Sequence, residues 1–130
     1  MTTATPTATE SVARELVEFC KAGRNLDGIS KLYSPEIVSI ESADFEGMPA
    51  RMTGIDAIRK KNEWWFANFE THSHEVDGPF VNGDQFAVKY TFDTTNKKTG
   101  VRRRDSEIAV YKVKDGRIVQ EQFFSHGAES

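Results

Sequence analysis

The chain has 130 residues, a formal net charge of −3 and a single cysteine, Cys20. This length is enough for one domain with its own hydrophobic core, and one cysteine excludes an intramolecular disulfide. The slightly acidic balance argues against a nucleic-acid-binding surface, and no apolar stretch is long enough to cross a membrane. Small molecules and other proteins remain as partners.

The N-terminal residues are typical of a tail rather than of a targeting segment. The first ten residues are rich in Thr and Ala and have neither a basic start nor an apolar run. We therefore expect no signal peptide and a cytoplasmic location. Residues 1–6 are expected to form a flexible tail and residues 7–130 a single domain, because no linker or repeat interrupts them.

Two helices are predicted after the tail. Thr7 and Glu10 have the spacing of a capping box, and they precede apolar residues at helical spacing for about 14 residues. Asn25 is expected to cap a second, short helix. That helix must stop at Ser34, because Pro35 disfavours α geometry in the residue before it.

A short strand and a third helix are expected next. The apolar period changes to two from Glu36, which predicts a strand, and residues 43–52 read as irregular. Thr53 has the spacing of a helix cap and opens a third helix. Helical spacing places Trp65 in the interior, whereas the charged residues 59–63 are expected in solvent. Trp64 then belongs at the rim or on a dimer surface.

The rest of the chain predicts four long antiparallel strands. A three-residue loop at 82–84 sets His74 opposite Phe92 and Val76 opposite Tyr90, and it places His72 on the same face. The Asp115-Gly116 pair predicts a two-residue hairpin turn between two β-rich segments.

Counting outward from the Asp115-Gly116 turn assigns the faces of the last hairpin. Tyr111 falls opposite Gln120, and Glu107 falls opposite Phe124, so Glu107, Tyr111 and Phe124 share one face. Helices gathered on one side of an antiparallel sheet define an α+β two-layer fold. A strongly bent sheet of this kind encloses a cavity, which is the usual place for a ligand.

The chain resembles the nuclear transport factor 2-like superfamily and, within it, the SnoaL-like proteins, which include polyketide cyclases and relatives of ketosteroid isomerase. The resemblance implies a cone-shaped α+β barrel with three helices and an internal pocket, commonly a homodimer through the outer face of the sheet. It implies no cofactor and no single chemistry, since isomerases, cyclases, dehydratases, epoxide hydrolases and non-catalytic modules share the fold. The stretches that carry it are LYSPEIVSIE at 32–41, GIDAI at 54–58, GDQFAV at 83–88 and EIAVYKVKDGRIV at 107–119.

The resemblance also suggests where catalytic carboxylates would lie. The general base of the isomerase lies nine residues after the Leu of a Leu-Tyr pair, and the same count from Leu32 reaches Glu41. Glu107 stands approximately where the isomerase has a protonated Asp. An unpaired carboxylate at that mid-strand position is costly, so Glu107 needs a salt bridge, for which Arg103 and Lys89 are candidates, or a function.

Two classes of function remain open from the sequence. The first is a cofactor-free isomerase, cyclase or dehydratase that removes a proton from a small apolar or aromatic metabolite, with Glu41 or Glu107 as base and His74 or Tyr90 positioning an oxygen. The second is a non-catalytic binding or interaction module with structural carboxylates and histidines. No metal is expected, because His72 and His74 alone are a weak zinc motif. The expected pocket residues are Tyr33, Trp65, His72, Tyr90, Phe92, Tyr111 and Phe124.

Overall fold

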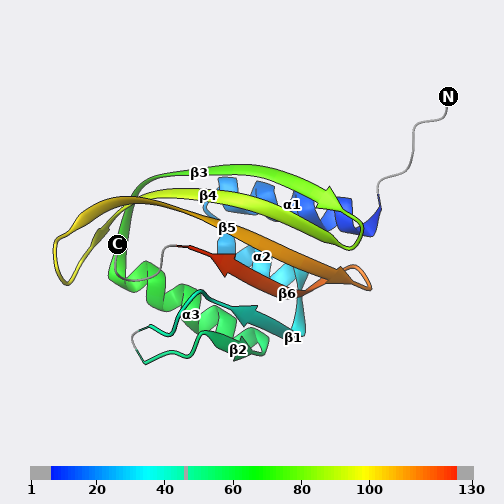
Figure 1. Cartoon of the computed structure of the whole chain (residues 1–130), viewed down its shortest axis with the longest axis horizontal. Coiled ribbons are helices and arrows are strands. Elements are labelled where there is room, and N and C mark those ends of the chain that lie inside the picture. The colour runs from blue at the N-terminus through cyan, green and yellow to red at the C-terminus, as the bar shows by residue number, and fades with distance from the viewer. Residues whose placement is uncertain (1–6, 46, 126–130) are drawn as a thin grey trace.

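The computed structural model describes residues 7–45 and 47–125, so the predicted tail at 1–6 lies outside the described residues. Three helices lie on one side of a curved sheet (Figure 1). No helix in the described part of the chain is long and apolar enough to span a membrane. The elements are α1 (Ala8–Lys21), α2 (Asn25–Leu32), β1 (Tyr33–Ile40), β2 (Arg51–Thr53), α3 (Ile55–Asn68), β3 (Phe69–Asn82), β4 (Gln85–Asn96), β5 (Arg102–Lys114) and β6 (Arg117–Phe124).

The six strands form one sheet in the order β2-β1-β6-β5-β4-β3. All neighbouring strands are antiparallel except β1 and β6, which run parallel, so the sheet is mixed. The α+β class is confirmed, and β2 and β3 remain as open edges of the described sheet. β2 begins within the segment 43–52 that the sequence pattern assigned to irregular structure and ends at Thr53.

Of the three predicted helix caps, the structure confirms only the one that a side-chain hydrogen bond completes. Thr7 accepts from the Glu10 N–H and Glu10 accepts from the Thr7 N–H, so the predicted capping box of α1 is confirmed. Asn25 is the first residue of α2 rather than its cap. Gly54, with φ of 98°, occupies the N-cap position of α3, so the cap predicted at Thr53 is not formed.

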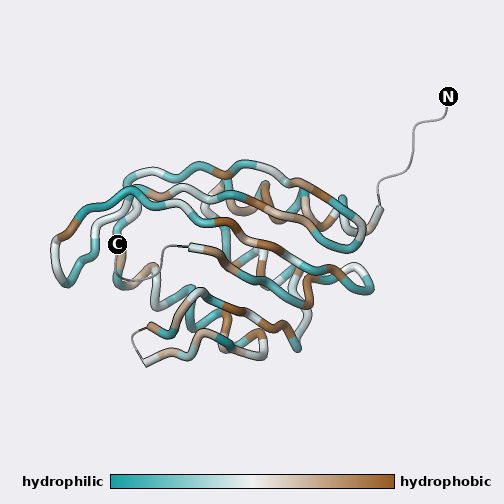
Figure 2. Tube along the Cα trace, in the orientation of Figure 1, coloured by the Kyte–Doolittle hydropathy of each residue, from teal (hydrophilic) through white to brown (hydrophobic). Residues whose placement is uncertain are grey.

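The hydrophobic core lies between the helices and the concave face of the sheet. Ile37, Ile58, Phe86 and Ile118 are fully enclosed, and the inner residues of α1 pack on them. Hydrophobic positions recur along the helices and strands, whereas the tip of the β4–β5 hairpin is mostly hydrophilic (Figure 2). Burial of this core holds the curved sheet against the helices.

A β-bulge in β6 changes the register predicted for the last hairpin. The turn itself is confirmed, because Lys114 pairs with Arg117. Beyond it Val119 is an extra residue, so Tyr111 pairs with Glu121 and not with Gln120. A shift of one residue turns every following side chain to the other face. Glu121 therefore points into the fold.

The same bulge overturns the assignment of Phe124 to the pocket. Phe124 pairs with Ile108 rather than with Glu107, and it is 52% exposed. Phe123 takes the inward position instead, opposite Ala109.

Two bulges in β3 correct the strand pairing at the other edge. The β3–β4 loop has two residues, since Asn82 pairs with Gln85, so the three-residue loop is wrong. An extra residue at 78–79 then restores the predicted His74–Phe92 and Val76–Tyr90 pairs. Proline at such a position is favoured because it cannot donate a ladder hydrogen bond.

The second bulge of β3 moves His72 out of the predicted face. Thr71 pairs with Thr94 and Ser73 with Asp93, which leaves His72 as the extra residue. His72 is exposed, and its Nε2 lies 2.7 Å from the Thr95 hydroxyl. Its assignment to the pocket is therefore wrong.

Candidate functional site

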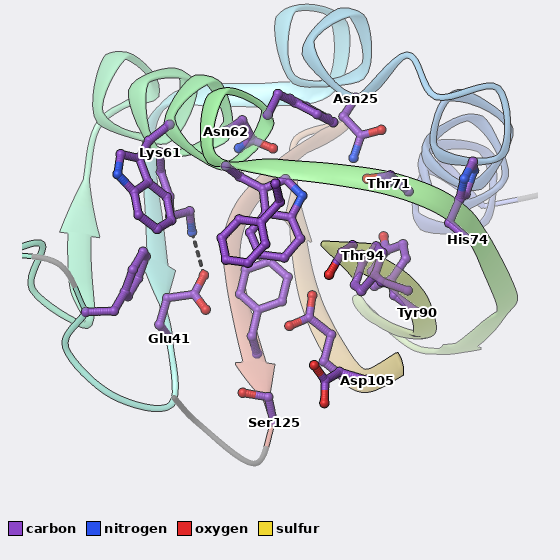
Figure 3. Close-up of a pocket in the computed structure, with 18 of the residues that line it drawn as sticks. Asn25, Glu41, Lys61, Asn62, Thr71, His74, Tyr90, Thr94, Asp105 and Ser125 are labelled. Carbon is purple, nitrogen blue, oxygen red and sulfur yellow. Dashed lines mark hydrogen bonds and ion pairs between the residues drawn. The ribbon is translucent and has the colours of Figure 1, made fainter. Parts of the chain in front are cut away.

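A pocket of about 1060 Å³ opens between the helices and the concave face of the sheet. Residues of α1, α2 and α3 line one side, β3–β6 line the other, and the loop after β1 borders it. Figure 3 shows Glu41 and His74 at opposite ends of this space. Glu41, Glu107 and His74 all line the pocket, as do Tyr33, Trp65, Tyr90, Phe92 and Tyr111.

Lys61 of α3 is the centre of a charged network in the pocket wall. Its Nζ lies 2.8 Å from Glu41 Oε2 and 3.3 Å from Glu121 Oε2. It also donates to Ser39 Oγ at 2.6 Å. Burial lowers the pKa of Lys61, but the attraction of Glu121 and Glu41 outweighs it, so the pKa is raised and the side chain stays charged.

Glu121 of β6 is the buried carboxylate of this network. It accepts a hydrogen bond from the Tyr33 hydroxyl and another from Ser39 Oγ at 2.7 Å. Only 2% of the residue is exposed. A buried carboxylate is tolerated when a cation and several donors surround it, and Glu121 meets that condition.

Glu41 is partly open to the pocket. Its side chain is 20% exposed, and only Oε2 contacts Lys61. Oε1 makes no hydrogen bond to any residue in the described ranges. Figure 3 shows this carboxylate beside the pocket, joined to Lys61. One oxygen of this ion-paired carboxylate is thus left to accept a proton.

Glu107 of β5 differs from the other two glutamates because it has no cation partner. Within the described residues it makes no hydrogen bond or ion pair, so the salt bridge considered to Arg103 or Lys89 is not formed. Burial raises the pKa of Glu107 to about 8; Glu41 and Glu121 add to this rise, and Lys61 opposes it. Glu107 is therefore mostly protonated at neutral pH.

Hydroxyl groups form a second polar wall. The Tyr90 and Tyr111 oxygens lie 2.7 Å apart, and Cys20 Sγ lies 3.6 Å from Tyr90. Burial is the main cause that raises the pKa of both tyrosines and of the Cys20 thiol. These groups are neutral donors at physiological pH.

His74 lies at the edge of the pocket and supports a helix end. Its Nε2 lies 3.2 Å from the Cys20 carbonyl and 3.3 Å from the Lys21 carbonyl, at the C-terminus of α1. Its exposed ring is away from Glu41 in Figure 3. The contacts favour the structural interpretation of His74 over a direct role beside Glu41.

Aromatic rings line the rest of the pocket. Trp65 stacks on Phe69 with ring centres 4.1 Å apart and lies 6.0 Å from Phe92. Trp64 also borders the pocket and contacts Phe45, so the expectation that only one tryptophan faces inward is wrong. The pocket therefore combines apolar walls with a few polar groups, as ligand sites do.

Two residues of the site escaped sequence reasoning, namely Lys61 and Glu121. Lys61 was assigned to solvent because of its charge, although it lies three residues after Ile58 and four before Trp65 on the inner face of α3. Glu121 was assigned to the outer face by the uncorrected hairpin register. The helical spacing of Lys61 relative to Ile58 and Trp65 could have predicted its inward position.

Three helices packed on a curved six-stranded sheet around a pocket are the arrangement of the ketosteroid isomerase-like fold, to which this chain is similar. The sequence model of the SnoaL-like domain matches residues 7–125, so the chain belongs to the SnoaL-like family. No curated protein matches the chain.

Three solved structures illustrate the similarity. A proposed SnoaL-like polyketide cyclase from Mesorhizobium loti, whose name also carries the words carbohydrate phosphatase, is 40% identical with a TM-score of 0.82, covering 88% of this chain and 96% of that one. A proposed isomerase from Bacillus subtilis is 20% identical with a TM-score of 0.72, covering 92% and 86%. A ketosteroid isomerase-like protein from Catenulispora acidiphila, solved with trimethylamine, is 15% identical with a TM-score of 0.68, covering 87% and 83%.

Proposed function

We propose that the protein is a cofactor-free enzyme of the isomerase, cyclase or dehydratase type, which removes a proton from a carbon next to a carbonyl group of a small apolar metabolite. The observation that supports it is the pairing of two unlike glutamates in one apolar pocket. Glu41 is ion-paired with Lys61, whereas Glu107 has no ion-pair partner among the described residues and keeps its proton at neutral pH. Two carboxyl groups with separated protonation states divide the roles of base and acid.

In this proposal Glu41 is the general base. Its Oε1 takes the proton from the carbon, and the electron pair of the broken C–H bond forms a C=C bond while the carbonyl electrons move to oxygen. Lys61 holds the carboxylate in place through Oε2. The proton on Glu41 then returns to another carbon in an isomerisation, or the enolate carbon attacks a second carbonyl in a cyclisation.

Glu107 has the complementary role of an acid. Its protonated carboxyl donates a hydrogen bond to the carbonyl oxygen, where negative charge develops during proton removal. Glu41 and Glu107 both line this pocket, and the charge of Glu41 contributes to the raised pKa of Glu107. The aromatic walls offer flat faces that orient a flat apolar molecule.

The proposal can be tested without knowing the natural substrate. 2-Tetralone is an uncharged bicyclic ketone whose α-hydrogens exchange in deuterium oxide, and proton NMR follows the exchange. The wild-type protein is expected to accelerate exchange. Glu41→Gln is expected to lower the acceleration by about 100-fold or more, and Glu107→Gln by about 10- to 100-fold, since an amide is a weaker donor than a carboxylic acid.

Glu36→Gln is the matched control for these variants. Glu36 lies exposed on β1 outside the pocket, and the substitution removes the same charge as Glu41→Gln. Exchange is expected to stay at the wild-type rate in this variant. If wild-type protein leaves exchange at the buffer rate, or if Glu41→Gln exchanges as fast as wild type, the enzymatic proposal is wrong.

A non-catalytic binding module is the second candidate function. The observation that favours it is the Lys61 contact of Glu41, because an ion-paired carboxylate also fits a purely structural role. Binding of 2-tetralone without accelerated exchange would support this alternative.

The homodimer through the outer face of the sheet is also proposed. Ile108 and Phe124 are register partners on that face, 47% and 52% exposed, and a second copy would cover this apolar pair. Ile108→Lys is expected to convert a dimer into a monomer in analytical ultracentrifugation. Leu26→Lys, at an exposed position of α2, should leave the dimer intact. A wild-type protein that sediments as a monomer would contradict the proposal.

A further inference from the structure

The charges that line the pocket are predominantly negative. Carboxylates come from the loop after β1, from β5 and from β6, whereas the lysine and arginine side chains in the described lining number two. The acidic residues are Glu41, Asp44, Asp105, Glu107 and Glu121, and the basic ones are Lys61 and Arg103.

Both cations are already engaged by protein carboxylates. Lys61 contacts Glu41 at 2.8 Å and Glu121 at 3.3 Å. Arg103 contacts Asp105 at 3.1 Å. In the described part of the lining, every lysine and arginine therefore already has a carboxylate partner.

Two of the lining carboxyl groups lack a cation in the described structure. Asp44 accepts the Ala50 N–H at 2.7 Å and makes no ion pair there. Glu107 is also without a cation, and its pKa is raised mainly by burial, with further contributions from Glu41 and Glu121. With Glu107 protonated at neutral pH, four carboxylates face two cations across the lining.

The walls between these charges strengthen their effect. Trp65, Phe69 and Phe92 form one aromatic cluster in the pocket, with ring centres 4.1 Å and 6.0 Å apart. Apolar walls focus the field of nearby charges, and the faces of aromatic rings carry partial negative charge. An anion entering this space would lose water and be repelled by these carboxylates.

We propose that the pocket selects ligands without negative charge, so that the substrate is a free apolar molecule with no anionic group and not a carboxylic acid or a phosphate ester. This specificity rests on the proposed function only in that both concern the same pocket. It arises from the excess of carboxylates and from the ion pairs that Lys61 and Arg103 already make with protein carboxylates.

Three compounds with the same bicyclic ring system test the proposal. 2-Tetralol is neutral, tetralin-2-carboxylate is anionic and 2-aminotetralin is cationic at neutral pH, and calorimetric titration into the full-length protein gives each Kd. The alcohol and the amine are expected to bind at least about tenfold more tightly than the carboxylate, because like charges in a desolvated site repel.

Two variants connect the selectivity to particular residues. Glu41→Gln leaves Lys61 with one carboxylate partner, and Asp105→Asn frees Arg103. Each is expected to raise the affinity for the carboxylate relative to that for the alcohol by about tenfold. Glu36→Gln changes the net charge equally but lies exposed outside the pocket, so it should not alter carboxylate binding.

The outcomes separate this proposal from the enzymatic one. A wild-type protein that binds the carboxylate as tightly as the alcohol, or that binds none of the three compounds, overturns it. Equal gains in carboxylate binding for Glu36→Gln and Glu41→Gln also overturn it, because overall charge then explains the effect. The order of Kd values is measured without 2-tetralone exchange, so either proposal can fail while the other stands.

Discussion

Lys61→Met is expected to lower the free energy of unfolding by about 3 to 5 kcal/mol, because it leaves a buried carboxylate without its cation. Glu121 has a side chain that is only 3% exposed, and the ammonium of Lys61 is the positive charge beside it. The hydrogen bonds from Tyr33 and Ser39 remain in the variant but cannot neutralise the charge. Methionine keeps most of the volume of the lysine stem, so loss of packing contributes little.

Urea denaturation followed by circular dichroism measures this loss. Lys60→Met is the matched control, since Lys60 is the exposed neighbour on the same helix and its loss should cost less than about 0.5 kcal/mol. The double variant Lys61→Met with Glu121→Gln should recover much of the stability, because the unpaired charge is gone. A loss below about 1 kcal/mol in the single variant, or no recovery in the double one, would contradict the role assigned to the network.

Local features of the fold were predictable from the sequence because neighbouring residues determine them. The capping box at Thr7 and Glu10 needs only the side chains of one helical turn. The Asp115-Gly116 turn needs two residues that tolerate positive φ, and both have it in the structure, at 52° and 76°. Neither feature depends on how distant segments pack.

Strand register was not predictable in the same way, because the positions of bulges depend on how the neighbouring strands pair. Val119 is the extra residue where β6 must pair with β5 on one side and with β1 on the other. Counting along an ideal hairpin ignores such a residue, so Phe124 was assigned to the inner face in place of Phe123. His72 was misplaced for the same reason at the bulge in β3. Beyond each bulge the error is a complete change of face.

The candidate site was predictable in its carboxylates but not in their partners. Family spacing led to Glu41, and alternation along β5 led to Glu107, and both line the pocket. The partner of Glu41 is four residues before Trp65 on a predicted helix, but its charge was interpreted as a sign of exposure. Glu121 becomes compatible with burial only when the parallel β1–β6 pair brings Ser39 beside it, a contact between residues 82 positions apart.

Glu107 supplies the second large expected effect, which is a change in the pH dependence of stability. Its carboxyl group has a pKa of 4.5 in the unfolded chain and about 8 in the folded protein, mainly because of burial. Between these values the unfolded state loses the proton and the folded state keeps it. Stability therefore falls as the pH rises through this window and levels off above about pH 8.

Glu107→Gln removes this dependence, since an amide does not ionise. The variant should match wild type near about pH 4.5 and exceed it by about 2 kcal/mol above about pH 8, because each pH unit in the window is worth at most about 1.4 kcal/mol and solvent in the open pocket screens part of it. Urea denaturation across this pH range measures the difference, with Glu36→Gln as the control that follows wild type. A difference that stays constant or narrows with rising pH would mean that Glu107 is ionised in the folded protein. Glu107 could then no longer be the hydrogen-bond donor of the proposed reaction, and the acid would have to be sought at the Tyr90–Tyr111 pair.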